Sequence, residues 1–325
     1  MENTFNSIES ICKAIASNAF SVNVASKSEL ITIESERMKD KEYLGKYRNL
    51  KRVVVSIKPI RYIIAKRRCT VIESFRKEET RVEIHLTALK DLIENKDKYI
   101  ETFEMLDDTS KKVYLNMLLC RLTGNYLYAM KVCSSKVQYF SDRIIWKDAE
   151  NIVDCGAFTG DTLQAFMNSK IRIKNYYLYE LDDGNYQKMI KTCDCANRQG
   201  IHTFPKKSGV YNQSKTLYFE ADADSSRIVD YETQNQVAVV SIDEDIHDTV
   251  TFIKMDIEGS ELEAIDGAKK TIRKYKPTLA ICIYHKQSDF WQIPLRIKEI
   301  CPEYNNFWIE QYSPWDMETV FFASV

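Results

Sequence analysis

Apolar and polar positions follow two different patterns along the chain. Up to about residue 145, apolar residues recur at helical spacing between charged ones, and this pattern predicts a mostly helical region. A short run at Val53–Ile57, before Pro59, could instead form a strand. From residue 151 onward, short apolar runs alternate with helical patterns, which predicts a parallel sheet with helices on both faces.

The second region has enough segments for a complete α/β domain. We expect strands near 151–155, 175–180, 201–205, 252–256, 278–284, 306–311 and 318–323. We expect helices near 160–170, 184–198, 260–275 and 290–302. Strand-like runs at 215–219 and 237–241 predict a β-hairpin insertion. Because the last two strands flank a short connection, they should be antiparallel. A seven-stranded, mostly parallel sheet with an antiparallel terminal hairpin is the Rossmann-like outline of class I methyltransferases.

The most informative stretch is 151–162. Its apolar run stops at Asp154, Gly156 and Gly160 follow, and apolar residues then recur at helical spacing, which indicates a strand, a tight turn and a helix N-terminus. Glycine lets backbone N–H groups approach a ligand, and the helix end favours an anionic group. Twenty positions after Gly160, another strand-like run ends in Glu180, which suits a ribose hydroxyl pair.

The glycine spacing indicates which nucleotide this turn would accept. A pyrophosphate usually needs G-x-G-x-x-G, and only Gly156 and Gly160 are present. The pattern therefore favours a ligand with a ribose and no pyrophosphate, such as S-adenosylmethionine. An ordinary α/β turn that binds nothing is the alternative.

A second polar group follows the run that begins at Phe252. Lys254, Asp256, Glu258 and Glu261 stand at or just after the end of this expected strand, where open α/β sheets bind ligands. Such groups can orient and deprotonate a hydroxyl, or the three carboxylates can hold a divalent metal. Helix capping and salt bridges are the alternative.

His285 follows the next strand-like run, 278–284. It should stand at the same sheet edge as Asp256, and the unperturbed pKa of histidine suits proton abstraction near neutrality. The sequence therefore indicates a general base, with a purely structural histidine as the alternative. His85, His202 and His247 have no such placement.

Composition and charge narrow the possible partners. The chain has 325 residues, 44% of them hydrophobic, and a net charge of −1, which gives no global reason for a polyanionic partner. Residues 46–68 nevertheless contain nine Lys or Arg and no acid. This basic run is either a solvated helix face or a patch for anionic lipid, acidic glycan or nucleic acid.

The cysteines and the first residues bear on the compartment. Nine cysteines are scattered along the chain, and Cys193 and Cys195 have no second pair or nearby histidine to complete a zinc site. The N-terminus carries Glu2, Glu9 and Lys13 without a long apolar run. We therefore expect a reduced, cytoplasmic location. No apolar run is long enough to span a membrane.

Taken together, these motifs resemble the FkbM family of S-adenosylmethionine-dependent methyltransferases. The matching segments are 153–162, 253–261 with Gly267-Ala268, 283–286 and 318–322, and the strongest is 254–259. The resemblance covers about residues 105–323. It implies a methyltransferase domain at 105–325 with a hairpin insertion near 209–243. An N-terminal helical region at 1–104 would then serve as a lid, an oligomerisation element or a determinant of acceptor selection.

The resemblance also implies a set of site residues. Glu180 would hold the ribose hydroxyls, and Lys207, Ser208 and Gly209 would lie beside the adenine. The full set expected around S-adenosylmethionine is Tyr139, Asp154, Gly156, Ala157, Phe158, Thr159, Gly160, Asp161, Thr162, Glu180, Leu181, Ser208, Gly209 and Asp256.

The expected activity is O-methylation, because the family mostly methylates hydroxyl oxygens of sugars, polyketides or other secondary metabolites. His285 would be the base, and Lys254, Asp256 and Glu258 would complete the catalytic group, orienting the acceptor or a divalent cation. Three alternatives stay open: a nicotinamide-dependent oxidoreductase, a non-catalytic scaffold or regulatory protein, and a nucleic-acid methyltransferase. The missing third glycine argues against the oxidoreductase. The intact acidic motif with His285 argues against the scaffold, and the lack of an N-P-P-Y or S-P-P-Y motif argues against the nucleic-acid methyltransferase.

Overall fold

The chain forms two compact units in a computed structural model. The structure describes residues 6–16, 81–147, 149–222, 225–229 and 236–325. One unit comprises Met1–Ser141 and Trp308–Val320, and the other comprises Asp142–Phe307 and Phe321–Val325. The expected strand at Val53–Ile57 and the basic run at 46–68 lie outside the described residues.

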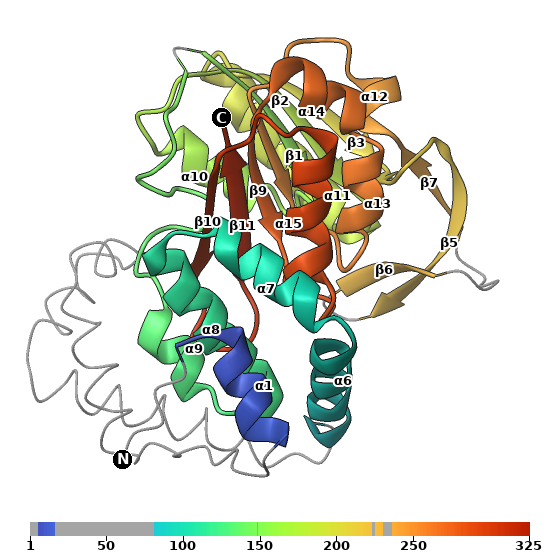
Figure 1. The fold of residues 1–325 in the computed structure, drawn as a ribbon. Helices are drawn as coiled ribbons and strands as arrows, with labels where there is room; N and C mark the ends of the chain where they lie inside the picture. The colour runs from blue at the N-terminus through green and yellow to red at the C-terminus, as the bar shows by residue number, and fades with distance from the viewer. Residues whose placement is uncertain (1–5, 17–80, 148, 223–224, 230–235) are drawn as a thin grey trace, which may run out of the picture. The chain divides into compact units, whose positions relative to one another are not determined.

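The first stretch of the first unit consists mainly of helices where it is described. Its helices are α1 (Ile8–Ala16), α6 (Arg81–Glu94), α7 (Lys96–Met105), α8 (Asp108–Thr123) and α9 (Leu127–Val132) (Figure 1). Helix α8 has a cap at each end: the Asp107 carboxylate accepts from the Ser110 N–H, and Gly124 ends the helix in the left-handed conformation. The Ser110 hydroxyl in turn accepts from the Ile309 N–H at 3.1 Å, which joins α8 to the second stretch of this unit.

A seven-stranded sheet is the centre of the fold, with the order β10-β11-β9-β8-β1-β2-β3. Its strands are β1 (Glu150–Cys155), β2 (Ile173–Glu180), β3 (His202–Lys207), β8 (Phe252–Met255), β9 (Thr278–Cys282), β10 (Asn306–Gln311) and β11 (Thr319–Ser324). Strands β3, β2, β1, β8 and β9 pair in parallel, and β10 and β11 form the antiparallel terminal hairpin. The fold class expected from the sequence is confirmed.

Two groups of helices cover this sheet. Helices α10 (Asp161–Met167) and α11 (Asp183–Arg198) pack against each other, and α13 (Glu261–Asp266) and α14 (Lys269–Tyr275) pack against α15 (Asp289–Ile300). Right-handed crossovers place the groups on opposite faces, because the chain runs outward from β1 in one direction and from β8 in the other. Helices α13, α14 and α15 lie in front of the sheet in Figure 1.

The helix expected at 260–275 is divided in two at Gly267. A side chain at this position would approach the Tyr211 carbonyl oxygen to 2.0 Å, so the backbones must pass close together there. The Gly267 carbonyl accepts from the Asp243 N–H and the Ser241 hydroxyl instead of continuing the helix. These tertiary contacts separate α13 from α14. They cannot be predicted from the spacing of apolar residues.

The insertion forms a second sheet with the order β4-β7-β5-β6. Its strands are β4 (Gly209–Val210), β5 (Lys215–Asp222), β6 (Ser225–Val229) and β7 (Gln236–Val240), and the short helix α12 (Ile242–Asp245) follows. The runs expected at 215–219 and 237–241 correspond to β5 and β7, which pair antiparallel. Strands β4 and β6 were not expected.

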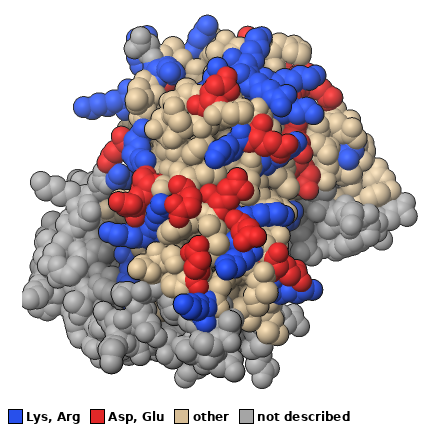
Figure 2. All heavy atoms as spheres, viewed as in Figure 1, with Lys and Arg blue, Asp and Glu red and all other residues tan. Residues whose placement is uncertain are grey.

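The surface agrees with the near-zero net charge. Acidic and basic side chains are interspersed on the described part of the face shown in Figure 2. Among the described helices, none is both long enough and apolar enough to cross a membrane.

Candidate active site

Four parallel strands end at a common edge of the sheet. Cys155 at the end of β1 pairs with Tyr179 of β2 and Met255 of β8, and Met255 pairs with Ile281 of β9. The chain order reverses between β1 and β8, and such a switch point is where open α/β sheets bind ligands. The segments that follow these strands therefore form the candidate site.

The turn after β1 contacts the segment after β8 very closely. Gly156 and Gly160 have φ angles of 78° and 80°, in the left-handed region that favours glycine. A Cβ atom at Gly156 would lie 1.8 Å from the Asp256 carbonyl oxygen, so no other residue fits there without movement. The two motifs singled out in the sequence are thus in direct backbone contact.

The N–H groups of this turn are used within the protein. Gly156 and Ala157 donate to the Tyr179 carbonyl at 3.0 and 2.9 Å, and Phe158 donates to the Glu180 carboxylate at 2.7 Å. The sequence argument expected such groups to face a ligand. In the structure they fix the turn to β2, so the turn contributes shape more than free donors.

Glu180 lies against the turn, as expected. Its two oxygens accept from the N–H groups of Phe158 and Asp182 at 2.7 and 2.8 Å. Burial raises the pKa of this carboxyl, and the backbone donors oppose that effect. A carboxylate has about four acceptor positions, so this group keeps capacity for hydroxyl donors.

Ser208 stands next to Glu180 at the same edge. Lys207, the residue before it, is in register with Glu180 in the β2–β3 pair. The Ser208 hydroxyl is buried and has no hydrogen-bond partner among the described residues. Because buried hydroxyls are normally paired, this group is available to a ligand. Gly209 follows at the start of β4.

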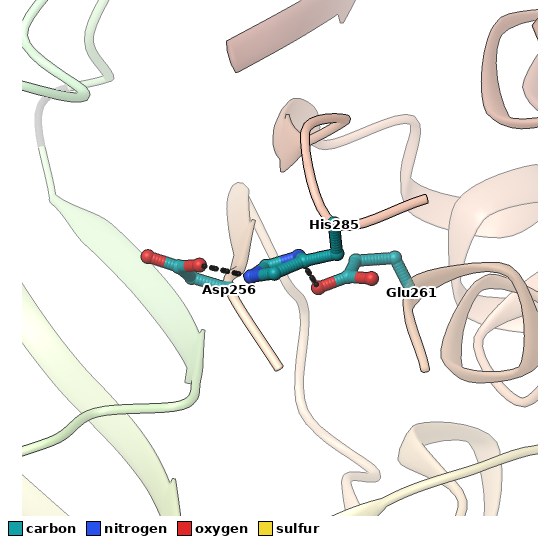
Figure 3. Close-up of side chains that lie close together, drawn as sticks. All are labelled: Asp256, Glu261 and His285. Atoms are coloured by element: carbon teal, nitrogen blue, oxygen red, sulfur yellow. Dashed lines mark ion pairs between the residues drawn. The ribbon is translucent and has the colours of Figure 1, made fainter. Parts of the chain in front are cut away.

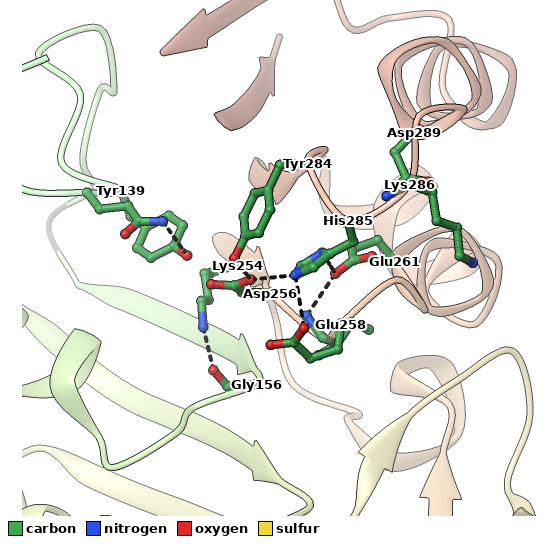
Figure 4. A network of polar contacts seen from close by, with 12 residues as sticks. Tyr139, Gly156, Lys254, Asp256, Glu258, Glu261, Tyr284, His285, Lys286 and Asp289 are labelled. Atoms are coloured by element: carbon green, nitrogen blue, oxygen red, sulfur yellow. Dashed lines mark hydrogen bonds and ion pairs between the residues drawn. The ribbon is translucent and has the colours of Figure 1, made fainter. Parts of the chain in front are cut away.

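Asp154 and Lys254 form a buried ion pair beneath the turn. The Lys254 ammonium lies 3.0 Å from the Asp154 carboxylate and donates to the Gly156 carbonyl at 2.5 Å (Figure 4). The Tyr176 hydroxyl donates to the other Asp154 oxygen at 3.0 Å. Burial alone would lower the pKa of Lys254, but the carboxylates of Asp154 and Asp256 raise it further, so the lysine is charged. Lys254 therefore holds the turn in position from its buried side.

His285 lies among three carboxylates (Figures 3 and 4). Its Nδ1 atom is 3.0 Å from Glu261 Oε1. Its Nε2 atom is 3.5 Å from Asp256 Oδ1 and 3.6 Å from Glu258 Oε2. Glu258 has a φ of 56° and begins a tight turn with Gly259, whose φ is 93°. Strain of this kind in a non-glycine residue is concentrated at functional sites.

The carboxylates change the acid–base behaviour of His285. Burial would lower the pKa of this histidine, but Glu261, Asp256 and Glu258 together raise it to about 9. The sequence argument assumed an unperturbed pKa. The imidazole is instead protonated at neutral pH, and it becomes a proton acceptor at alkaline pH.

Two neighbours of this cluster were not singled out by the sequence reasoning. The Tyr284 hydroxyl donates to Asp256 Oδ1 at 2.9 Å. Asp289 is buried at the start of α15, where it accepts from the Lys286 N–H at 2.8 Å, and burial raises its pKa to about 7. Tyr284 precedes His285 directly, so its position in that motif was the available signal.

The remaining expected residues have simpler surroundings. Thr162 is buried in α10, Leu181 is half-buried after β2, and Asp161 is exposed at the start of α10. The Thr159 carbonyl accepts from the Thr192 hydroxyl at 3.0 Å. Tyr139 belongs to the other unit, where its hydroxyl accepts from the Gln138 amide at 2.9 Å.

The metal expectation also has a structural counterpart. Ligand atoms of Asp256, Glu261 and His285 lie within 4.8 Å of one another. Asp256 and Glu261 contact different nitrogens of the ring, however, with Nε2 on one side and Nδ1 on the other. A metal ion bound to a histidine uses one ring nitrogen, so carboxylates that bind the same ion would lie beside that nitrogen. The arrangement here therefore favours a chain of ion pairs.

The strand order and the site at the carboxyl ends of the strands define a class I methyltransferase fold. Residues 154–315 match the family model described as the methyltransferase FkbM domain, so this part of the chain belongs to the FkbM methyltransferases, as the sequence predicted. No curated protein matches the sequence.

The chain is also similar to solved structures. The crystal structure of Methyltransferase FkbM from Methylobacillus flagellatus KT is 27% identical with a TM-score of 0.63, covering 72% of this chain and 60% of that one. This chain thus spans less than two thirds of that relative. An rRNA methylase from Streptococcus thermophilus is 12% identical with a TM-score of 0.36, covering 56% and 90%. Aeropyrum pernix fibrillarin, solved with natively bound S-adenosyl-L-methionine, is 11% identical with a TM-score of 0.35, covering 55% and 67%.

Replacing Lys254 should destabilise the fold strongly. Lys254→Met leaves the Asp154 carboxylate buried without its counter-charge, which typically costs roughly 3–5 kcal/mol. The double variant with Asp154→Asn should recover part of the loss, because neither buried charge is then left alone. Urea unfolding of these two variants, of Asp154→Asn alone and of the parent protein measures this. Equal losses in Lys254→Met and in the double variant would contradict a stabilising pair.

The raised pKa of His285 should make stability depend on pH. Its pKa is about 9 in the folded protein against an ordinary 6.5, so the folded state binds the extra proton between these values. The stabilisation is complete below pH 6.5 and is lost as the pH rises through about 9. The loss is on the order of 3 kcal/mol by linkage. Urea unfolding at pH 6 to 10 should show it in the parent protein and much less in His285→Gln.

Proposed function

We propose that this chain is an S-adenosylmethionine-dependent O-methyltransferase acting on a hydroxyl of a sugar, a glycan or a secondary metabolite. The observation that carries the proposal is the backbone contact between Gly156 and Asp256. It joins the turn suited to the nucleoside with the cluster suited to proton transfer. A methyl donor and an acceptor hydroxyl must meet in this way for the reaction to proceed.

The described residues fit S-adenosylmethionine. Glu180 would accept from the ribose hydroxyls, and the unpaired hydroxyl of Ser208 supports the adenine side. Gly156, Phe158 and Gly160 would line the methionyl part, since Phe158 is 48% exposed at the turn. Asp154 would act indirectly, because it is fully buried and holds the turn through Lys254. Tyr139 stays a predicted cofactor residue.

Bound S-adenosylmethionine would supply an activated methyl group to the acceptor oxygen, and its sulfur would keep the electron pair of the sulfur–methyl bond. The protein must then take the hydroxyl proton. His285 in its neutral form would accept this proton at Nε2, the nitrogen that faces the more exposed carboxylates. Asp256 and Glu258 would orient the acceptor hydroxyl, and Tyr284 fixes the Asp256 carboxylate.

Three further proposals concern the compartment, the division of the chain into domains and an anionic partner. We infer a reducing, cytoplasmic setting, supported by the eight described cysteines, which are all free thiols. Residues 1–104 would contribute acceptor selection, a lid or oligomer contacts, with 105–325 as the methyltransferase domain. The basic run at 46–68 would contact an anionic surface.

Substitution at Gly156 should abolish cofactor binding. Gly156→Ala places a Cβ atom 1.8 Å from the Asp256 carbonyl oxygen and displaces the turn. Gly200→Ala is the matched control, because Gly200 has a φ of 86° and no atom within 4 Å of the added Cβ. Calorimetry with S-adenosylhomocysteine should show binding by the parent and by Gly200→Ala, and none by Gly156→Ala. NAD serves as the rival ligand, and binding of NAD in place of S-adenosylhomocysteine would refute the proposal.

Substitution at His285 should separate turnover from cofactor binding. His285→Ala removes the proton acceptor, so turnover should fall roughly 10²–10⁴-fold, while S-adenosylhomocysteine binding is kept. Cell extract incubated with protein and S-adenosylmethionine would be searched by mass spectrometry for molecules that gain one CH₂ unit, which also identifies the acceptor. His202→Ala, at an exposed position of β3, is the control. Parallel loss of binding and turnover in His285→Ala would reject the base assignment.

A further inference from the structure

Glu261 has an environment that its role in capping a helix does not explain. Its side chain is fully buried at the start of α13. One carboxylate oxygen accepts from the Ile257 N–H at 2.8 Å and also lies 3.0 Å from Nδ1 of His285. The other oxygen is buried without a hydrogen-bond partner among the described residues. Burying a carboxylate is costly unless an opposite charge accompanies it, and here that charge is the imidazolium.

The four charged side chains form a series from the interior to the surface. Their exposed fractions are 0% for Glu261, 8% for His285, 22% for Asp256 and 42% for Glu258. The imidazole stands between the innermost carboxylate and the two outer ones, with a different nitrogen facing each side (Figure 4). An acceptor can therefore reach only the Nε2 side.

We propose that Glu261 is a positioning residue that acts through His285, holding the proton of the neutral imidazole on Nδ1 so that Nε2 is left to accept the proton of the acceptor hydroxyl. This inference rests on the proposed function. In the step, the O–H bond breaks, its electron pair stays on oxygen, and the proton moves to Nε2. The resulting imidazolium is stabilised by Glu261 and then releases its Nε2 proton to water. A buried carboxylate on Nδ1 is a general way to fix both the tautomer and the orientation of a histidine base.

Glu261 and His285 interact through their charges. Neither ring nitrogen of His285 makes a hydrogen bond of good geometry with a described residue, although Nδ1 is 3.0 Å from the Glu261 oxygen. Glu261 is also the strongest of the influences that raise the pKa of His285. The other charged groups around the ring are Asp256 after β8, Glu258 in the following turn, and Lys286 and Asp289 at the start of α15.

The test is a titration of the histidine side chains by nuclear magnetic resonance. The chain has four histidines, so the imidazole signals are few, and the signal missing from His285→Gln assigns this residue. In the parent protein, His285 should titrate near pH 9, and its neutral form should carry the proton on Nδ1. Glu261→Gln keeps an oxygen for the Ile257 N–H but removes the charge, so the pKa of His285 should fall by about one unit or more. Glu263→Gln is the matched control, because residues two apart on a helix do not face each other, and it should leave the titration unchanged.

Three titration results would overturn the inference. They are a parent titration near the ordinary 6.5, a neutral form with its proton on Nε2, and an unchanged pKa in Glu261→Gln. Stoichiometric broadening of the His285 signal alone by Mn²⁺ would also overturn it, since it would indicate a cation site. The parent measurements decide the matter even if Glu261→Gln does not fold. Calorimetry with S-adenosylhomocysteine on the same samples tests the proposed function separately, because the tautomer and the pKa do not depend on it.

Discussion

The buried pair of Asp154 and Lys254 is the interaction on which the site depends. It joins β1 to β8 at the point where the strand order reverses, and the same ammonium holds the carbonyl of Gly156. Stability alone does not require a charge pair at this position, since apolar residues of similar volume would pack as well. The directed contacts of the pair give the turn one fixed position, and the segments proposed for cofactor binding and for proton transfer are both arranged around that turn.

The site separates its polar groups by depth. The innermost groups, Asp154, Lys254 and Glu261, are buried and contact only protein, whereas Glu258 and Phe158 are exposed at the edge of the sheet. Glu180 and His285 lie between these layers. This order follows from the fold, because the central strands are covered by helices on both faces and the turns after them reach solvent. The residues proposed for proton transfer thus lie after the strands, and the buried strand residues Asp154 and Lys254 support the turn beside them.

Much of this could be read from the sequence, and the limits have physical causes. The alternation of strands and helices, the glycine turn, Glu180 and the gathering of Asp256, Glu258 and His285 at one edge all follow from local patterns and from the geometry of parallel sheets. Strand alternation gives the side on which Lys254 lies but not its depth, so its contact with Asp154 could not be predicted. The pKa of His285 depends on three distances across separate segments. The break at Gly267 depends on Tyr211, which lies far away in the chain.

The missing side chain at Gly156 has a consequence for how such a protein can change. The Asp256 carbonyl occupies the space that a methyl group would need, so the turn at Gly156 and the loop at Asp256 pack together without room for a larger residue. Neither segment can be reshaped alone, because a change in one has to be accommodated by the other. The inserted sheet after β3 and the amino-terminal helices are free of this restriction, and they are the parts in which the chain adds most to a minimal α/β domain.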